Sequence, residues 1–440
     1  MTQNDRHLQT VLVQGPYLVR SASITDNTLE LVGDIDGDKN TLTIFAPSVE
    51  SVTWNGVELS TVSKDGNMLT ATVTGPESFT LPALGPWKWH DSLPEIQPNY
   101  TVSPNVWTTA DHQNTSNPSK PASNNPVLFL DEYHIHVGSS IYRATFPSTA
   151  SVPSGVFLNI TGGKAFGYSA WLNGAYIGSY LGASTSATGQ KEFTFENATL
   201  AAEGKDNVLV VVMDNSGHDQ TSGALTPRGI WNATLLGADA SFSDWKIAGP
   251  AGGEDNIDPI RSVYNEGGLY AERVGMHLPE YPDDDWESVG GANSTTTTLV
   301  VPAAGIRVFR AVVPLSVPEG LDVSISFQFS APGNGSTKST FLPDDAAHSN
   351  QVRALLFVNG YQFGRFNPYI GNQITFPVPT GILDYGGDNT VAVTLWSQSA
   401  QGVEVRLGWN VDYVHTTGYD MGFDAQYLRP GWSEDRLAYA

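Results

Sequence analysis

Short apolar segments separated by turn residues run along most of this chain. The first of them lie at residues 11–13, 17–19, 28–32 and 41–45. They are rich in β-branched or aromatic residues and are bounded by Gly, Asp and Asn, a pattern typical of strands. Long amphipathic helical patterns are nearly absent, and strands do not alternate with helices as they would in a parallel α/β barrel. The pattern predicts an all-β protein.

Two segments of the chain repeat the same hairpin pattern. Residues 170–180 and 356–366 both place two apolar residues before Asn-Gly, and both carry a second glycine four positions after the first. Asn-Gly between alternating strands favours a two-residue hairpin turn, because both residues accept positive φ angles. We therefore expect Asn173 and Asn359 to occupy equivalent hairpins.

The repeat extends beyond the hairpins in the same order. Matching segments lie at residues 141–144 and 308–311, at 192–195 and 373–376, and at 206–212 and 388–394. A period of about 180 residues is the length of a whole domain, so the repeat indicates duplication of one sandwich. We predict tandem jelly-roll β-sandwiches.

A small all-β domain precedes the two large ones and contains its own Asn-Gly hairpin at Asn55. Residues 94–126 are rich in Asn, Ser, Thr and Pro, and Gly, Pro and acidic residues cluster at 249–258, so both stretches suit connections. The expected organisation is the end of a preceding domain at 1–20, a small β domain at 21–95, and jelly-roll domains at 96–258 and 259–440.

The charge and residue content exclude several functions. A formal charge of −23 repels nucleic acid and anionic membrane surfaces, whereas neutral sugars are unaffected. The absence of cysteine excludes thiol nucleophiles, Cys-bound zinc and disulfides. No apolar run approaches the roughly 18 residues of a membrane span, and the first residues lack the apolar region of a signal peptide.

Seven Asn-x-Ser/Thr sequences are candidates for N-glycosylation and mildly favour a secretory history. They begin at Asn99, Asn114, Asn159, Asn197, Asn232, Asn293 and Asn334.

Two groups of residues have the types, but not the spacing, of metal ligands. Residues 34–38 alternate Asp as a calcium loop does, but the twelfth position is Phe45, which cannot bind calcium. We expect a solvated hairpin turn there. His134 and His136 would share a face if they lie on a strand, near Asp131 and Glu132. No third ligand is fixed by spacing, so neither a metal nor a cofactor is expected.

Three glutamates are candidates for a glycosidase pair, namely Glu254, Glu266 and Glu272. Glycoside hydrolysis needs an acid and a nucleophile or base at a fixed separation across the sugar, and proximity in sequence does not supply that geometry. A Gly-x-Ser-x-Gly elbow and phosphate-binding glycine motifs are also absent. We assign no catalytic residue.

Some aromatic residues could stack on sugar rings. Trp171 and Trp396 lie within strand patterns and are expected in the cores, while Trp87 and Trp89 are expected in a loop between domains. Trp245, near a predicted junction, is a candidate sugar contact.

A polar segment at residues 213–223 follows a strongly apolar strand. Loops often display binding groups, so His218, Asp219 and Gln220 are further sugar-contact candidates. The alternative is a merely solvated loop.

Several of these motifs together resemble one family. Residues 11–20, 54–56, 107–112, 171–174, 227–230, 264–273 and 358–364 are similar, in order, to the third to fifth domains of fungal-type family 35 β-galactosidases. The resemblance implies jelly rolls of the galactose-binding-domain type and retaining hydrolysis of terminal non-reducing β-D-galactose residues. It also implies an extracellular location and catalytic glutamates on an amino-terminal barrel. No part of this chain resembles that barrel.

Three functions are therefore open at the level of the sequence. The chain could be the accessory C-terminal region of a β-galactosidase, with β-galactosides or a separate catalytic barrel as partners. It could be a stand-alone, lectin-like carbohydrate-binding protein. It could also be an autonomous glycosidase that uses carboxylates near Glu254 or Glu266.

Overall fold

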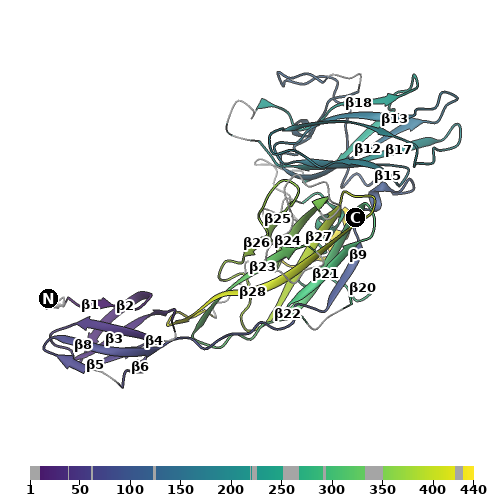
Figure 1. The fold of residues 1–440 in the computed structure, drawn as a ribbon. Coiled ribbons are helices and arrows are strands. Elements are labelled where there is room, and N and C mark those ends of the chain that lie inside the picture. The colour runs from purple at the N-terminus through teal and green to yellow at the C-terminus, as the bar shows by residue number, and fades with distance from the viewer. Residues whose placement is uncertain are drawn as a thin grey trace.

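The computed structural model is an elongated row of three β-sandwiches (Figure 1). The structure describes residues 10–37, 39–60, 63–121, 125–218, 220, 225–250, 267–290, 294–331, 350–421 and 430–440. The small sandwich lies at one end, the third sandwich in the middle and the second sandwich at the other end. The predicted all-β class, with a small domain before tandem jelly rolls, is confirmed.

The small sandwich packs two four-stranded arrays around one core. One sheet has the order β1-β4-β8-β7, and the facing strands are β2, β3, β5 and β6. Strict alternation along β8 buries Leu69, Ala71 and Val73 and leaves the residues between them facing outward. The strands are β1 (Leu12–Gln14), β2 (Leu18–Thr25), β3 (Thr28–Ile35), β4 (Lys39–Phe45), β5 (Ser51–Trp54), β6 (Val57–Glu58), β7 (Ser63–Asp65) and β8 (Met68–Thr74).

The second sandwich faces a six-stranded sheet, β10-β19-β12-β17-β14-β15, with a four-stranded sheet, β11-β18-β13-β16. A 3₁₀ helix, η1 (Pro94–Ile96), precedes it, and another, η2 (Leu130–Tyr133), follows β11. Its strands are β10 (Thr108–Thr109), β11 (Leu128–Phe129), β12 (Gly138–Pro147), β13 (Gly155–Thr161), β14 (Gly167–Leu172), β15 (Ala175–Tyr180), β16 (Thr188–Thr194), β17 (Asp206–Asn215), β18 (Gly229–Leu236) and β19 (Asp244–Ala248).

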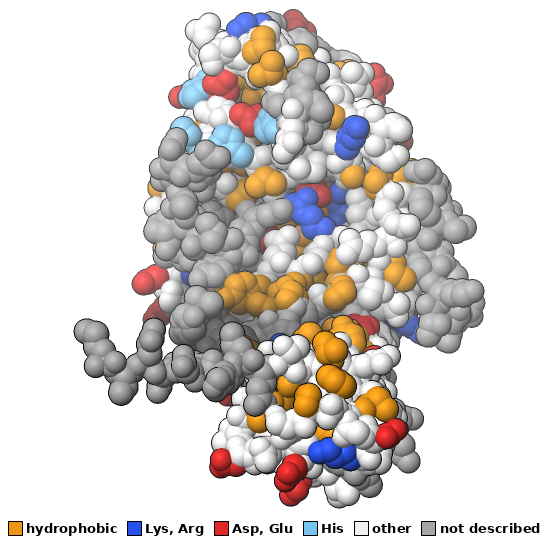
Figure 2. Space-filling view, turned by 90° about the vertical axis from the view of Figure 1, so that its left-hand side faces the viewer, with side chains coloured by type: hydrophobic (Ala, Val, Ile, Leu, Met, Phe, Trp, Pro, Cys, Tyr) orange, Lys and Arg blue, Asp and Glu red, His pale blue; other side chains and the backbone are white. Residues whose placement is uncertain are grey.

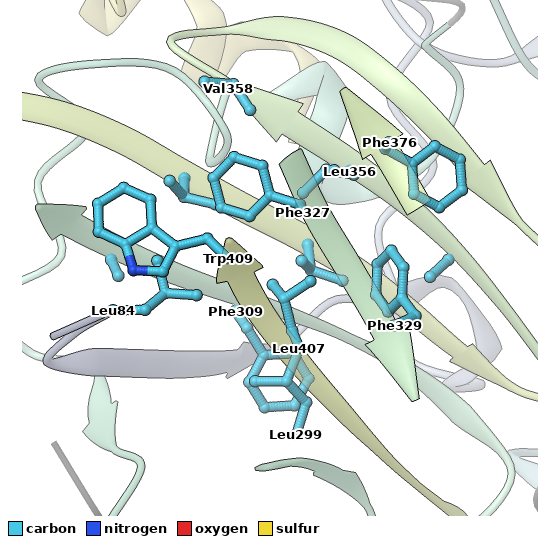
Figure 3. Close-up of a cluster of buried hydrophobic side chains, with 14 of the residues drawn as sticks. Leu84, Leu299, Phe309, Phe327, Phe329, Leu356, Val358, Phe376, Leu407 and Trp409 are labelled. Carbon is cyan, nitrogen blue, oxygen red and sulfur yellow. The ribbon is translucent and has the colours of Figure 1, made fainter. Parts of the chain in front are cut away.

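The third sandwich repeats this plan. Its six-stranded sheet has the order β20-β9-β22-β27-β24-β25, and β26, β23, β28 and β21 form the opposite layer. Phenylalanine side chains and Trp409 fill the space between the layers (Figure 3). The elements are β9 (Trp87–Asp91), α1 (Tyr270–Arg273), β20 (Glu287–Ser288), β21 (Thr296–Val301), β22 (Gly305–Pro314), β23 (Leu321–Ser330), β24 (Val352–Val358), β25 (Tyr361–Phe366), β26 (Thr375–Pro377), β27 (Asp388–Ser397), β28 (Val403–Thr417) and the 3₁₀ helix η6 (Glu434–Tyr439).

The duplication predicted from the sequence is confirmed at its two hairpins. Asn173 and Asn359 both have positive φ angles, 52° and 48°, and join β14 to β15 and β24 to β25. Asn173 Nδ2 donates to Asn207 Oδ1 (2.9 Å), and Asn359 Nδ2 donates to Asn389 Oδ1 (2.8 Å). The same turn is therefore held by the same side-chain bond in both sandwiches.

One strand of the third sandwich, β9, precedes the second sandwich in the sequence, whereas the other strands of the third sandwich follow it. Strand β9 lies within the range 21–95 that we assigned to the small domain, but it pairs with β22 and β20. Its Trp87 is buried in the third core, where it occupies the position that Trp245 of β19 has in the second. Trp89 is half-buried beneath the guanidinium of Arg307. The predicted interdomain loop is thus a core strand.

A continuous sheet joins the small sandwich to the third. The end of β28 pairs with β3, where Thr417 lies opposite Asp34. The carboxylate of Asp34 is buried, accepts two hydrogen bonds from Arg20 and accepts a third from Thr417 Oγ1 (2.7 Å). The expected solvated hairpin turn is therefore wrong, because β3 and β4 belong to different sheets and Asp34 closes the junction.

The second and third sandwiches meet through the outer faces of their six-stranded sheets. Trp171 and Trp396 are buried there, in a cluster that draws on both sandwiches, rather than inside either core as expected. Trp396 Nε1 donates to Ser169 Oγ (3.2 Å) across the junction. Strands β12, β17 and β27 are consequently buried on both faces. Within the described residues no helix is long and apolar enough to cross a membrane.

Candidate functional site

The polar loop that follows β17 begins at the junction between the second and third sandwiches. Asp214, the penultimate residue of β17, faces two arginines of the third sandwich. Arg353 Nη1 of β24 lies 2.9 Å from Asp214 Oδ2, and Arg365 Nη2 of β25 lies 3.3 Å from Asp214 Oδ1. One carboxylate thus receives guanidinium groups from two neighbouring strands of the other domain.

Arg353 is the central residue of this junction. Its buried guanidinium donates to Gln398 Oε1 (3.0 Å) and to the backbone oxygens of Ala165 and Leu181 (both 2.9 Å). Burial lowers the pKa of Arg353 below its ordinary value, and Asp214 opposes that shift. A Cβ at Gly167 would lie 2.6 Å from Nη2, so only glycine leaves room for the guanidinium.

A cleft of about 250 Å³ opens beside these charges. Ser216, Asn367 and Gln373 supply polar groups to its lining, and Ile370 is among its apolar residues. Asp214 is the single carboxylate among the lining residues, and it is paired with the two arginines. The cleft could hold a small polar molecule, but it lacks the pair of carboxylates that glycoside hydrolysis requires.

Beyond Asn215, the described loop residues Ser216, His218 and Gln220 are exposed on the second sandwich. His218 Nε2 lies 2.8 Å from Asp131 Oδ1, and the other oxygen of Asp131 accepts the backbone N–H of Arg228 (2.9 Å). Gln220 is exposed, whereas Asp219 lies outside the described residues. The loop is therefore joined to the junction at Asp214 and presents His218 and Gln220 to solvent.

Histidine and acidic side chains gather beside this loop, on the upper part of the view in Figure 2. His136 Nδ1 lies 3.5 Å from Asp131 Oδ1, and His112 Nδ1 lies 3.8 Å from Glu132 Oε2. His134 and His136 are not on a strand, because His134 ends η2 in a left-handed conformation. Across the described ranges no group of three or more His, Asp or Glu is arranged to hold a metal ion.

Trp245 offers no surface to a sugar. It is 2% exposed and packs in the core against Phe242 (ring centroids 4.7 Å apart) and edge-on against Tyr142 (6.3 Å). Our expectation of a sugar contact at Trp245 is corrected by this burial. The adjacent glycine-rich sequence suggested a junction, but β19 pairs with β12 inside the six-stranded sheet.

The candidate catalytic glutamates do not form a pair in the described structure. Glu272 is buried and accepts the backbone N–H groups of Gly267 (3.1 Å) and Leu269 (3.4 Å), so it caps α1. Glu254 and Glu266 lie outside the described residues. Sequence reasoning missed Glu95, which is fully buried in an ion pair with Arg273 (2.5 Å). Arg273 ends one of the motifs that resemble the family, but nothing in the sequence indicates its pairing with Glu95.

The candidate glycosylation sites differ in accessibility. Asn99, Asn114 and Asn197 are exposed. Asn159 and Asn232 face each other on the paired strands β13 and β18 and are only partly exposed. Asn293 and Asn334 lie outside the described residues. Glycosylation itself stays a prediction, with the exposed three as its best positions.

Comparison with known families matches both large sandwiches. The model of the β-galactosidase second all-beta domain matches residues 102–219 and 270–401, and the model of β-galactosidase domain 3 matches residues 2–70. The chain belongs to the β-galactosidase all-β domain family. The two segments of the first match correspond to the two copies of the sandwich in this β-galactosidase-type chain.

Curated relatives named as β-galactosidases match almost the whole length of this chain. "Probable beta-galactosidase B" of Aspergillus fumigatus is 49% identical over 443 residues, which cover 99% of this chain and 42% of the relative. The Penicillium rubens protein of that name is 47% identical over 98% of this chain and 41% of its own length. The chain thus spans about two fifths of these relatives, at their C-terminal end.

Solved structures give a weaker likeness. The apo form of Pleurotus ostreatus lectin covers 77% of this chain and 81% of its own, with 15% identity and a TM-score of 0.16. The Streptomyces avermitilis α-L-rhamnosidase complexed with L-rhamnose covers 85% of this chain and 31% of its own, with 12% identity and a TM-score of 0.20. TM-scores this low carry no argument about function.

Proposed function

We propose that this chain is the accessory C-terminal region of a β-galactosidase and supports a catalytic portion that hydrolyses terminal non-reducing β-D-galactose residues. The observation that carries the proposal is the match of 99% of the chain to the C-terminal part of β-galactosidase B relatives. The proposed surroundings are extracellular, as for a secreted enzyme, with Asn99, Asn114 and Asn197 as the glycan attachment sites.

The architecture suits a supporting role. The small sandwich is fixed to the third by the β28–β3 pairing, and the third is fixed to the second by Arg353 and by the buried cluster around Trp171 and Trp396. Junctions with buried charge pairs and large apolar side chains resist the relative motion expected of loosely linked domains. Such a body can hold a catalytic portion in one position.

The chain should not hydrolyse galactosides by itself. The buried acidic residues with defined partners act as structural groups: Glu95 pairs with Arg273, Glu272 caps α1 and Asp34 closes a junction. Hydrolysis of galactosides is accordingly assigned to the catalytic portion. In the assembled enzyme we place the exposed residues His218 and Gln220, with Asp219 between them, at the border of the active site, where they would contact the acceptor sugar.

A complementation experiment tests the proposal. The purified chain is mixed with the separately produced amino-terminal portion of the Aspergillus fumigatus relative, and hydrolysis of an aryl β-galactoside is measured. We expect no turnover by the chain alone and at least a tenfold gain in activity or half-life of the amino-terminal portion when the chain is added. No gain, together with retention of the chain alone on immobilised galactose, would instead favour the lectin-like function.

A further inference from the structure

The small sandwich presents a row of large apolar side chains to solvent. Leu12, Phe45 and Met68 are 64%, 46% and 43% exposed. They lie directly opposite one another on adjacent strands, since Leu12 pairs with Phe45 and Phe45 pairs with Met68. Figure 2 shows hydrophobic side chains gathered on the lower part of the molecule, where the small sandwich lies. Isolated exposed apolar residues are common, but a contiguous row marks an interaction surface.

The row is not a displaced part of the core. Ile44 and Leu69, the neighbours of Phe45 and Met68 along their strands, are 0% and 1% exposed and fill the interior of the small sandwich. Alternation along a strand then sends Phe45 and Met68 to the opposite face. These two positions could carry polar residues at no cost to the core, so folding of this domain does not require apolar side chains there.

The rest of the same sheet face is mostly polar, and the apolar row ends at the exposed Asp65 of β7, which lies opposite Met68. The next row consists of Gln14, Thr43 and Thr70, which again lie opposite one another. No outward-facing side chain that the structure describes on β1, β4 or β8 carries a charge. In a chain with a net charge of −23, the described outward-facing side chains of these three strands thus have their nearest paired charge at the border of the face, on Asp65. Depletion of charge around an apolar centre is characteristic of protein interfaces.

We propose that the outer face of β1, β4 and β8 is the docking surface for the portion of a β-galactosidase that precedes this region. This inference rests on the proposed function. In the relatives, that portion precedes the matched segment and joins it near the residues that match β1. Strand β1 is the edge strand of this sheet and carries Leu12. A tethered partner emerging there has a high effective concentration at the row.

A triple substitution tests the surface. Leu12→Thr, Phe45→Thr and Met68→Thr keep strand propensity and add no charge, so the variant should fold with an unchanged circular dichroism spectrum. Affinity for the separately produced amino-terminal portion of the Aspergillus fumigatus relative is measured by calorimetry. We expect at least a tenfold loss in the triple variant. A matched control, Val300→Thr with Val312→Thr, changes exposed residues of the third sandwich and should stay within twofold.

Hydrogen–deuterium exchange locates the contact independently. Binding should slow exchange in β1, β4 and β8 and leave β21 and β22 unchanged. If the complex forms and is active but the triple variant binds as tightly as the original chain, the docking surface is wrong while the proposed function stands. If the original chain forms no complex, both fall. Concentration-dependent dimerisation abolished by the triple substitution would overturn the proposal by identifying a second copy as the occupant.

Discussion

Single residues in this molecule are specialised for joining elements that are distant in sequence. Arg353 connects two sandwiches, Asp34 connects the small sandwich to β28, and the pair Glu95–Arg273 connects η1 to α1. Each of these groups is charged and buried, a state that is tolerated only when a partner and further hydrogen bonds replace water. Their substitution should therefore affect stability far more than that of surface charges.

The buried pair of Glu95 and Arg273 gives the sharpest test at this scale. Arg273→Met should destabilise the protein by about 3–5 kcal/mol, because it leaves the Glu95 carboxylate buried without its cation. The double variant Glu95→Leu/Arg273→Met should recover part of that loss. Denaturant unfolding measures both free energies. Equal destabilisation by the single and the double variant would show that the ion pair is not the cause.

His277 should make stability depend on pH. Burial, reinforced by the positive charge of Arg436, lowers the pKa of His277 to about 3. The ordinary value is about 6.5, so between these pH values the unfolded chain binds a proton that the folded chain does not. The contribution of His277 is complete above pH 6.5. It is lost as the pH falls toward 3, by roughly 1.4 kcal/mol per pH unit.

The non-titrating variant His277→Gln isolates this effect. Unfolding free energies of both proteins are measured from pH 7 to pH 4. The difference between them should shrink steadily below pH 6.5, because only the original protein has this proton to take up. A difference that stays constant over the range would contradict the assigned shift.

At the scale of elements, the Asn-Gly hairpins show how one residue fixes a turn and a register together. Asn359 donates to Ile382 O and Asn389 Oδ1, and its own Oδ1 accepts the backbone N–H of Thr390. Asn173 makes the equivalent contacts with Thr199, Asn207 and Val208. The asparagine is therefore both the left-handed turn residue and the bridge to the next strand.

Substitution separates these two roles. Asn359→Gly keeps the positive φ angle and loses the three side-chain hydrogen bonds, so it should cost about 2–4 kcal/mol. Asn359→Ala loses the same bonds and adds turn strain of about 1 kcal/mol. Unfolding followed by tryptophan fluorescence measures both. If the Asn359→Gly variant is as stable as the original protein, the turn conformation alone accounts for the stabilisation by Asn359.

Strand β9 makes the third sandwich depend on a distant segment. Deletion of residues 1–91 removes β9 and takes Trp87 from the third core, although Glu95 of η1 and the later strands of the third sandwich remain. We expect that protein to lose the third sandwich, as seen by rapid proteolysis within it. Deletion of residues 1–75 removes the small sandwich but keeps β9, so this shorter deletion is the matched control. Equal resistance of the two products would show that β9 is dispensable.

At the scale of the whole molecule, the chain passes through the third sandwich, builds the second and then returns. The second sandwich is therefore an insertion within the third, and Glu95, Arg273 and Arg353 lie where the two are joined. The three sandwiches joined in this way form an elongated row (Figure 1). That shape is consistent with the supporting role and leaves the outer face of β1, β4 and β8 free to dock.

Much of this organisation follows from the sequence by itself. Turn residues and alternation determined that the protein is all-β, and the repeated Asn-Gly segments determined that two sandwiches share one plan. The resemblance of its motifs indicated the family that the comparisons later showed. These features are local: Asn and Gly tolerate positive φ angles wherever they occur, and alternation follows from the geometry of a single strand.

Only the tertiary structure decided which sheet each strand joins and what covers it. Nothing local distinguishes β9 from a strand of the small domain, since its partner β22 lies about 220 residues away. Trp171 and Trp245 both lie in apolar strands, yet one is buried between sandwiches and the other inside one. Arg353 and Asp214 meet only when two folded sheets pack together. Long-range pairing and burial of a second sheet face depend on the whole fold, so no segment encodes them alone.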